Sequence, residues 1–193
     1  MEDAILRACA ESASHHDRLC PRQVLGVRMG LAGAARFGVE VPRSDRRLLV
    51  FAETDGCFAD GVMAATGCAV GHRTFRVQDY GRIAITVVDT ETREAVRIGV
   101  APGVREAALA FAPGETRRYY AQIEGYQRMP ERELLTVEPV ALAFDLDALM
   151  GRPGVRVDCD GCGEEVLNAR EIVADGRTLC PACVAPAYYR PLT

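Results

Sequence analysis

The sequence contains no lysine and no tryptophan, and all 23 of its basic residues are arginine. It also lacks any run of about 18 uncharged apolar residues, the length that spans a bilayer, so we expect no membrane-spanning segment. The first residues show no positively charged stretch followed by an apolar one, and we therefore expect no secretory signal. Together these absences predict a cytoplasmic protein.

The composition that remains is that of an ordinary globular protein. Hydrophobic residues make up 49% of the 193 residues and charged residues 26%, which excludes a disordered or collagen-like chain. This length allows one full core, or a core with a small additional domain. The net charge of -4 and the pI of about 5.5 argue against a protein that binds nucleic acid or anionic membranes.

Eight cysteines stand beside only three histidines. Thiols stay reduced in the cytoplasm, so this number favours metal binding or redox chemistry over a disulfide scaffold. Four cysteines lie in the last 35 residues as two C-x-x-C pairs, and the other four are spread over the first 68 residues. The two groups therefore require separate interpretations.

Hydrophobic periodicity predicts a mixture of helices and strands before the last two cysteine pairs. The expected helices cover 2–14, 21–38, 57–66, 102–111 and 115–126, and the expected strands cover 48–52, 82–89, 95–100 and 134–142. Pro139 should place the last strand at a sheet edge or at a bulge, because proline cannot donate to a strand ladder. The Gly- and Pro-containing stretch 151–154 is the expected linker.

The pairs Cys159/Cys162 and Cys180/Cys183, separated by 17 residues, have the spacing of a four-cysteine zinc site. The glycine after Cys162 suits the tight turn of such a site, because it tolerates a positive φ. The segments 165–167 and 171–173, with a turn at 175–176, predict a small hairpin between the pairs. This is the arrangement of a zinc ribbon or a treble-clef-like module, in which one structural zinc ion supplies the folding free energy.

A thioredoxin-type redox pair and two disulfides are the alternatives for these four cysteines. A redox C-x-x-C would need no second pair, which favours zinc. The stretch 155–193 carries four arginines and six acidic residues, and a zinc ion held by four thiolates adds further negative charge. Because DNA-binding modules need a basic face, this charge favours contact with protein, or dimerisation, over contact with nucleic acid.

A second group of reactive side chains comprises His16, Cys20, Cys57 and Asp60. Cys20 precedes a proline and should be the N-cap of a helix, where the helix dipole favours a thiolate. Cys57 should lie in the first turn of another helix, capped by Asp55, with Asp60 on the same face. If the two helices converge, these residues would form a redox or metal site.

The alternative is that these cysteines are small buried hydrophobic residues and that His16 is an ordinary loop residue. Cys68 and His72 lie near the other end of the 57–66 helix, about 15 Å from Cys57 at about 1.5 Å per residue, too far to share one metal ion. Cys9 lies on the apolar face of the first expected helix. Core packing is the expected role of both Cys9 and Cys68.

Two stretches of the sequence resemble the signature of the E-subunit family of formylmethanofuran dehydrogenase. The first runs from His15 to Pro21 and on to Gly26-Val27-Arg28-Met29, and the second is Glu53-Thr54-Asp55-Gly56-Cys57-Phe58-Ala59-Asp60. Thr66-Gly67-Cys68 and Asp79-Tyr80-Gly81 extend the resemblance, which covers roughly residues 12–145. A C-terminal four-cysteine ribbon is a frequent companion in that family.

The resemblance implies an α+β core domain over 1–150, with helices packed on a small, mainly antiparallel sheet, followed by a zinc ribbon over 155–185. It also implies a homodimer, and a molybdenum or tungsten oxidoreductase or another protein as partner. One departure affects the core site. The family motif reads His-Gly-His-x-Cys-Pro, so its first histidine falls on His16 whereas its second falls on Arg18. A possible imidazole ligand is thus missing.

These observations predict a cytoplasmic zinc-binding accessory protein that contacts no nucleic acid and no membrane. Zinc would be structural in the ribbon, and a second metal or a reactive thiol would occupy the core site. There Cys20 and Cys57 would be ligands or nucleophiles, His16 a ligand or base, and Asp60 a supporting carboxylate. The alternatives are a metal- or thiol-dependent enzyme acting on a small one-carbon substrate, and a metal- or redox-sensing regulator.

Overall fold

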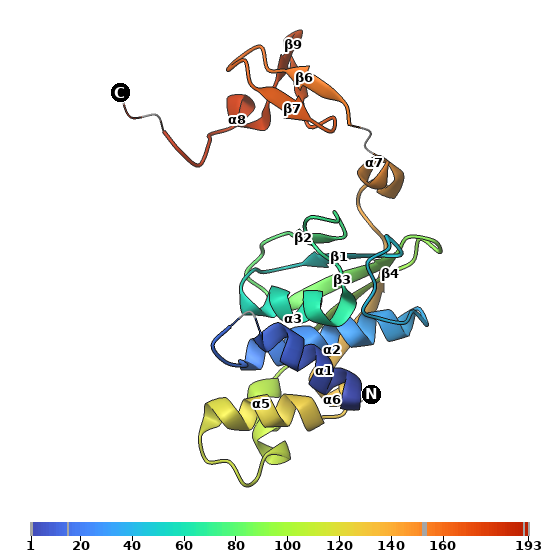
Figure 1. Ribbon diagram of the computed structural model, residues 1–193, viewed down its shortest axis with the longest axis vertical. Helices are drawn as coiled ribbons and strands as arrows, with labels where there is room; N and C mark the ends of the chain where they lie inside the picture. The colour runs from blue at the N-terminus through green and yellow to red at the C-terminus, as the bar shows by residue number, and fades with distance from the viewer. Residues whose placement is uncertain (1, 15, 152–153, 191, 193) are drawn as a thin grey trace. The chain divides into compact units, whose positions relative to one another are not determined.

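A computed structural model of the chain describes residues 2–14, 16–151, 154–190 and 192 (Figure 1). The chain divides into two compact units, Met1–Leu142 and Ala143–Thr193. Two residues of the expected linker, Arg152 and Pro153, lie outside the described residues, as does His15. Within the described ranges, no helix combines the length and the apolarity that a membrane crossing requires.

The first unit is built on a five-stranded sheet in the order β2-β1-β3-β4-β5. The strands are β1 (Leu48–Ala52), β2 (Phe75–Val77), β3 (Ala84–Asp89), β4 (Ala95–Val100) and β5 (Leu135–Val140). All neighbouring strands pair antiparallel except β1 and β2, which are parallel. The fold is therefore α+β, as predicted, and β5, which contains Pro139, lies at a sheet edge.

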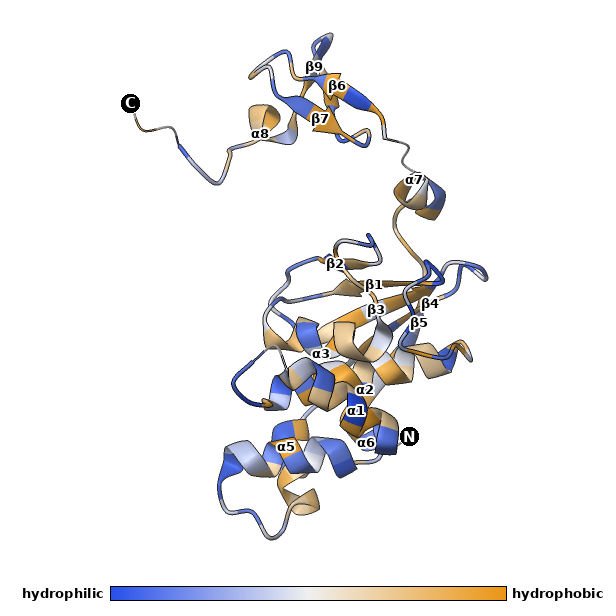
Figure 2. Ribbon diagram, in the orientation of Figure 1, coloured by the Kyte–Doolittle hydropathy of each residue, from blue (hydrophilic) through white to orange (hydrophobic). Residues whose placement is uncertain are grey.

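Three helices, α1 (Glu2–Ala13), α2 (Pro21–Arg36) and α3 (Cys57–Thr66), pack together beside the sheet (Figure 1). The central helix is α2, which contacts β3, β4, α1, α3 and α5 (Arg118–Arg128). Its residues from position 23 to 34 are all buried, which explains why its sequence is apolar on nearly every side. Strand β3 lies at the hydrophobic end of the scale in Figure 2, whereas much of α5 is hydrophilic.

A buried arginine joins α5 to the central helix. The guanidinium of Arg28 in α2 donates to the carbonyl oxygens of Tyr126 and Met129, at 2.5 and 2.8 Å. These carbonyls belong to the C-terminal end of α5, where backbone acceptors lack partners within the helix. The contact holds α5 beside α2 and thereby positions the side chains of α5 that line the candidate site.

The structure differs from the sequence pattern at four places in this unit. Strand β2 is only three residues long and occurs in a polar stretch, so its own sequence does not indicate a strand. It is a strand because it pairs with β1. The helix expected over 102–111 is divided into α4 (Val104–Ala107) and the 3-10 helix η1 (Ala108–Phe111). The next helix begins at Arg118 rather than at Glu115, and a short helix, α6 (Glu131–Leu134), precedes β5.

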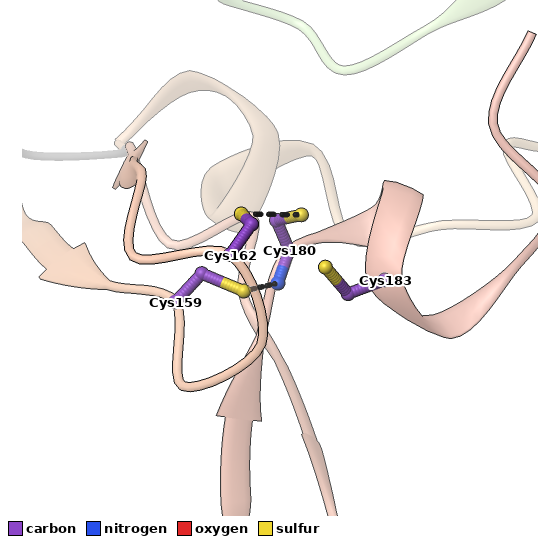
Figure 3. A group of neighbouring side chains, drawn as sticks. All are labelled: Cys159, Cys162, Cys180 and Cys183. Carbon is purple, nitrogen blue, oxygen red and sulfur yellow. Dashed lines mark hydrogen bonds between the residues drawn. The ribbon is translucent and has the colours of Figure 1, made fainter. Parts of the chain in front are cut away.

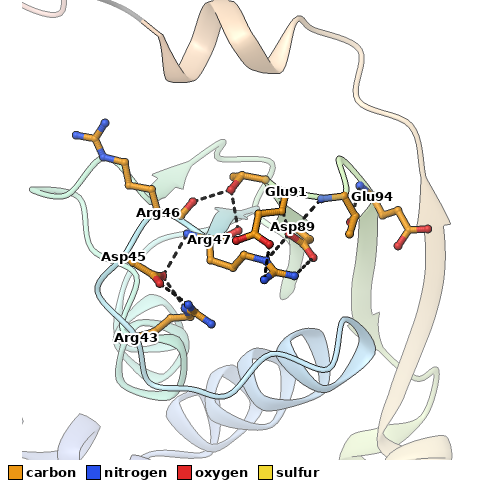
Figure 4. A network of polar contacts seen from close by, with 9 residues as sticks. Arg43, Asp45, Arg46, Arg47, Asp89, Glu91 and Glu94 are labelled. Carbon is orange, nitrogen blue, oxygen red and sulfur yellow. Dashed lines mark hydrogen bonds and ion pairs between the residues drawn. The ribbon is translucent and has the colours of Figure 1, made fainter.

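A polar network closes the end of the sheet where β1 begins and the β3–β4 turn lies (Figure 4). Arg47 donates to both carboxylate oxygens of Asp89, at 2.7 and 2.8 Å, and also pairs with Glu91. The Asp89 side chain is only 1% exposed. Hydrogen bonds from Arg47, and then from the backbone of the turn, hold the pKa of Asp89 at about 2, well below 3.8.

This network predicts acid-sensitive stability. Because the folded-state pKa of Asp89 is depressed, its contribution is fully present above pH 3.8 and is lost as the pH falls towards 2. The depressed pKa of Asp89 contributes about 2 kcal/mol to the free energy of unfolding at neutral pH. Asp89→Asn should lower the free energy of unfolding at pH 7 by about that amount, measured by urea denaturation, and the deficit should shrink at pH 3. Glu94→Gln, an exposed change in the same turn, is the control, and equal losses in both variants would contradict the assignment.

The second unit contains two short antiparallel hairpins and two short helices. Strand β6 (Arg156–Asp158) pairs with β7 (Glu165–Leu167), and β8 (Ile172–Ala174) pairs with β9 (Arg177–Leu179). The helices are α7 (Leu146–Met150) and α8 (Pro181–Val184). The predicted hairpin between 165–167 and 171–173 is wrong, because each of these segments pairs instead with a strand next to a cysteine pair.

Candidate functional site

The sulfur atoms of Cys159, Cys162, Cys180 and Cys183 lie within 4.8 Å of one another (Figure 3). The first pair comes from the β6–β7 turn, and the second from the start of α8. Zn–S bonds of about 2.3 Å in a tetrahedron place the sulfurs about 3.8 Å apart, and Sγ of Cys162 lies 3.9 Å from Sγ of Cys180. This cluster can therefore hold a metal ion such as zinc.

Backbone hydrogen bonds shape the first cysteine turn and connect it to the second. The amide of Gly163 donates to the carbonyl of Cys159 at 2.8 Å, and Gly163 has the positive φ, 76°, that its position after Cys162 predicts. The amide of Asp160 donates to the carbonyl of Thr178 at 2.8 Å, and the Asp160 carboxylate accepts from the Thr178 amide at 2.7 Å. These contacts bring the two pairs together.

Cys159 is the buried member of the cluster, 2% exposed. Its sulfur accepts hydrogen bonds from the amides of Cys180, at 3.2 Å, and Gly161, at 3.4 Å. Backbone amides, led by that of Cys180, lower the pKa of the Cys159 thiol to about 6. Metals bind the thiolate, so the backbone around Cys159 favours the ligating form of this one cysteine.

In the first unit, the structure brings Cys20 and Cys57 into contact, with their sulfur atoms 2.9 Å apart. Cys20 is the N-cap of α2, as expected, and its sulfur accepts the amide hydrogen of Gln23 at 3.4 Å. Cys57 is the first residue of α3. The convergence on which a core site depends is thus present for the two thiols.

The approach of α2 to α3 depends on two glycines that face each other. A Cβ on Gly26 would lie 2.2 Å from the carbonyl oxygen of Phe58, and one on Gly61 would lie 2.2 Å from the carbonyl oxygen of Gln23. Both obstacles are backbone atoms, which cannot turn away as a flexible side chain can. Only glycine at these positions allows the helices, and with them Cys20 and Cys57, to approach this closely.

Gln23 is a residue of the site that the sequence interpretation missed. Its Oε1 accepts the amide hydrogen of Cys20 at 2.7 Å, and its Nε2 donates to the carbonyl and the hydroxyl of Ser12, each at 2.9 Å. This completes a capping box and attaches the end of α1 to the start of α2. The signal was available, because Cys20 and Gln23 have the spacing of an N-cap residue and its N3 partner.

His16 and Asp60 form a separate pair, with Nε2 of His16 2.8 Å from Oδ2 of Asp60. Both side chains are about one-third exposed, at 34% and 30%. In the part of the chain that the structure describes, the only group of three or more clustered His, Cys, Asp and Glu side chains is the four-cysteine cluster. The core residues therefore lie as two pairs rather than as one compact group.

The electrostatics of the core thiols differ from the expected thiolate pair. Burial, followed by the hydrogen bond with Cys20, raises the pKa of Cys57 to about 11. Without a metal, Cys57 therefore keeps its proton at neutral pH. Asp55 does not cap α3 as expected; the N-cap is Gly56, which has no side chain to accept a hydrogen bond.

The two remaining cysteines of the first unit are buried. Cys9 and Cys68 belong to the hydrophobic core, 4% and 3% exposed. Burial raises the pKa of Cys9 to about 11, which keeps it protonated and unreactive. All eight cysteines are free thiols.

A pocket of about 670 Å³ opens beside Cys20 and Cys57. Tyr119 of α5 contributes to its wall and its hydroxyl donates to the carbonyl of Leu19 at 3.3 Å. Burial raises the pKa of Tyr119. The sequence offered no signal for Tyr119, because it lies about 100 positions from Cys20 and reaches the thiols only through the packing of α5.

The sequence profile described as "FmdE, Molybdenum formylmethanofuran dehydrogenase operon" matches residues 15–136, which include both core pairs. The chain belongs to the FmdE family. The crystal structure of an FmdE-like protein of the tungsten formylmethanofuran dehydrogenase type, from Syntrophus aciditrophicus, superposes with a TM-score of 0.62, over 96% of this chain and 95% of that one. Its identity to this chain is 20%, so the likeness shows a shared fold.

A curated relative of this FmdE-family chain is the "Probable S-adenosyl-L-methionine-binding protein" of Archaeoglobus fulgidus, which is 30% identical over 207 aligned positions. The alignment covers 97% of this chain but only 55% of the archaeal protein. The chain thus spans about half the length of that relative. The family profile ends before the four-cysteine cluster, which lies in the second unit.

Proposed function

We propose that this FmdE-family chain is a cytoplasmic accessory protein with a structural zinc ion in its C-terminal unit and a metal or reactive-thiol site in its first unit. The observation that carries the proposal is the four-cysteine cluster, whose sulfur spacing and backbone hydrogen bonds suit one zinc ion. Cys159, Cys162, Cys180 and Cys183 would be its ligands. The ion would hold together two hairpins that have little core of their own.

For the first unit we propose a site formed by Cys20 and Cys57, with His16 and Asp60 beside it. The two sulfurs in contact support a reactive dithiol, and thiolates are soft donors that suit zinc or a similar metal. His16 would serve as ligand or base, and Asp60 would orient it. The pocket next to the thiols gives a small molecule room to reach them.

Metal analysis of the purified chain tests both sites. We expect two metal ions per chain, falling to one in Cys20→Ser, because serine is a poor ligand for soft metals. Arg36→Gln, at the far exposed end of the same helix, should keep both ions. One ion per chain in all three proteins would leave only the ribbon ion and would restrict the core site to thiol chemistry.

We propose protein partners rather than nucleic acid as the binding targets of the second unit. The family description, which names a dehydrogenase operon, supports an oxidoreductase partner, and we also propose a homodimer. Apolar side chains on the strands of the second unit support protein contact, since Val173 is 73% exposed and Leu167 42%. Light scattering of the purified chain tests the dimer, and a monomeric mass would refute it.

A second candidate function is a thiol- or metal-dependent enzyme acting on a small substrate. The observation that favours it is the pocket of about 670 Å³ that opens onto Cys20 and Cys57, a volume within the range of small-molecule sites. The archaeal relative is described as a probable S-adenosyl-L-methionine-binding protein. Titration of the chain with S-adenosyl-L-methionine would test whether that property extends to this shorter protein.

A further inference from the structure

The pocket beside Cys20 and Cys57 has a charge opposite to that of the whole chain. Two of its described lining residues, Arg22 and Arg105, are cationic, and none of them is an aspartate or glutamate. The chain as a whole has a net charge of -4. Both arginines are solvent-exposed, so an anion entering this open cavity would meet two cationic side chains and no carboxylate.

Neither of these arginines has a partner among the described residues. The side chains of Arg22 and Arg105 make no hydrogen bond or ion pair there, although Arg22 is close enough to Cys57 to lower its pKa slightly against the larger effect of burial. Arg97, by comparison, is engaged in a bidentate pair with a buried glutamate. The two guanidinium groups of the pocket are thus available to a ligand.

Three of the carboxylates near the pocket in sequence, Glu53, Glu106 and Asp60, are paired with other residues. Glu53, beside the lining residue Thr54, pairs with Arg97 and Arg82. Glu106, beside Arg105, pairs with Arg118. Asp60, one turn after Cys57, pairs with His16, and the exposed Asp55 does not line the cavity.

The rest of the wall indicates the body of the ligand. Leu25, Ile83, Val100 and Val104 provide apolar surface, and two tyrosines of α5, Tyr119 and Tyr126, provide aromatic surface. Arginines fix a carboxylate or phosphate through charge-assisted hydrogen bonds, and apolar and aromatic walls bind a planar or apolar body. A small hydrophilic ion would leave most of this surface without contact.

We propose that this pocket binds an organic oxyanion, a carboxylate or phosphate monoester with an apolar or aromatic body, whose anionic group lies at Arg22 and Arg105. This deepens the proposed function, because it gives the Cys20/Cys57 site a class of ligand. Binding itself needs only the arginines and the wall, so it stands or falls separately from the metal content of the site.

Calorimetric titration of the full chain with four probes tests the proposal: benzoate, phenyl phosphate, benzamide and inorganic phosphate. Benzamide has nearly the shape of benzoate without its charge, so we expect benzoate to bind about tenfold more tightly. The stronger of benzoate and phenyl phosphate identifies the oxyanion. Absence of saturable binding of both at millimolar concentration, or equal affinity for benzamide and benzoate, would overturn the proposal. If inorganic phosphate bound as tightly as phenyl phosphate, the claim that the ligand has an apolar or aromatic body would be refuted.

Charge-neutralising variants locate the site. Arg22→Gln and Arg105→Gln should each weaken binding of the preferred anion about tenfold and leave benzamide unaffected, whereas Arg36→Gln, on the exposed far end of α2, should change neither. Unchanged anion affinity in both pocket variants would refute the assignment. Metal content is measured on the same samples. Loss of anion binding with unchanged metal content would be a failure of the pocket alone, and loss of metal with unchanged anion binding would be a failure of the proposed metal site alone.

Discussion

Replacement of Cys159 by serine is expected to release the metal of the four-cysteine cluster and to unfold residues 155–185. This stretch has almost no core, because only Cys159, Val166 and Asn168 are buried in it. Structural zinc sites contribute on the order of 10 kcal/mol of folding free energy, far more than one buried valine, at about 2 kcal/mol, can supply. Losing a ligand therefore removes the main source of stability.

Zinc content and limited proteolysis of the full chain measure this effect. Cys159→Ser should lose one metal ion per chain and become cleavable throughout 155–185, while the first unit keeps its urea unfolding midpoint. Asp158→Asn, an exposed change at the adjacent position, is the matched control and should retain both metal and resistance. A protease-resistant, metal-free Cys159→Ser protein would show that the hairpins fold without zinc.

Gly61→Ala is expected to destabilise the first unit although alanine is the better helix former. The helical preference favours alanine by about 1 kcal/mol, but its Cβ would lie 2.2 Å from the backbone oxygen of Gln23. Overpacking of this kind costs about 1–3 kcal/mol, and here the obstacle is backbone that can yield only by moving α2. The clash prevails, and we expect a net loss of about 2 kcal/mol.

The same substitution should separate the two core thiols. Urea unfolding reports the stability, and phenylarsine oxide, which bridges two neighbouring thiols, reports their distance in protein that carries one zinc ion per chain, in the four-cysteine cluster, and no metal at Cys20 and Cys57. Phenylarsine oxide should bridge Cys20 and Cys57 in the unaltered chain but not in Gly61→Ala. Gly71→Ala is the control, because nothing lies within 4 Å of its added Cβ, and it should change neither reading. Unaltered bridging in Gly61→Ala would mean that the approach of α2 and α3 does not set the sulfur distance.

Much of the fold could be predicted because its elements carry strong local patterns. Helix α2 has a proline after its N-cap and apolar residues on nearly every side, and β1 is a short apolar run. Strand β2 could not be predicted, because its three residues lie in a polar segment and form a strand only by pairing with the edge of β1. The hairpins of the second unit were predicted with the wrong partners, because short strands carry no register of their own.

Residue spacing alone predicts the four-cysteine cluster and the capping role of Cys20. Both depend on spacing along a few residues, where the chain has little freedom. The contact of Cys20 with Cys57, in contrast, depends on how the helices pack, because it follows from the backbone approach at Gly26 and Gly61. The tertiary structure also decides that Arg22, Arg105 and Tyr119 line one pocket, since the packing of distant segments sets which side chains share a cavity, and no local pattern records it.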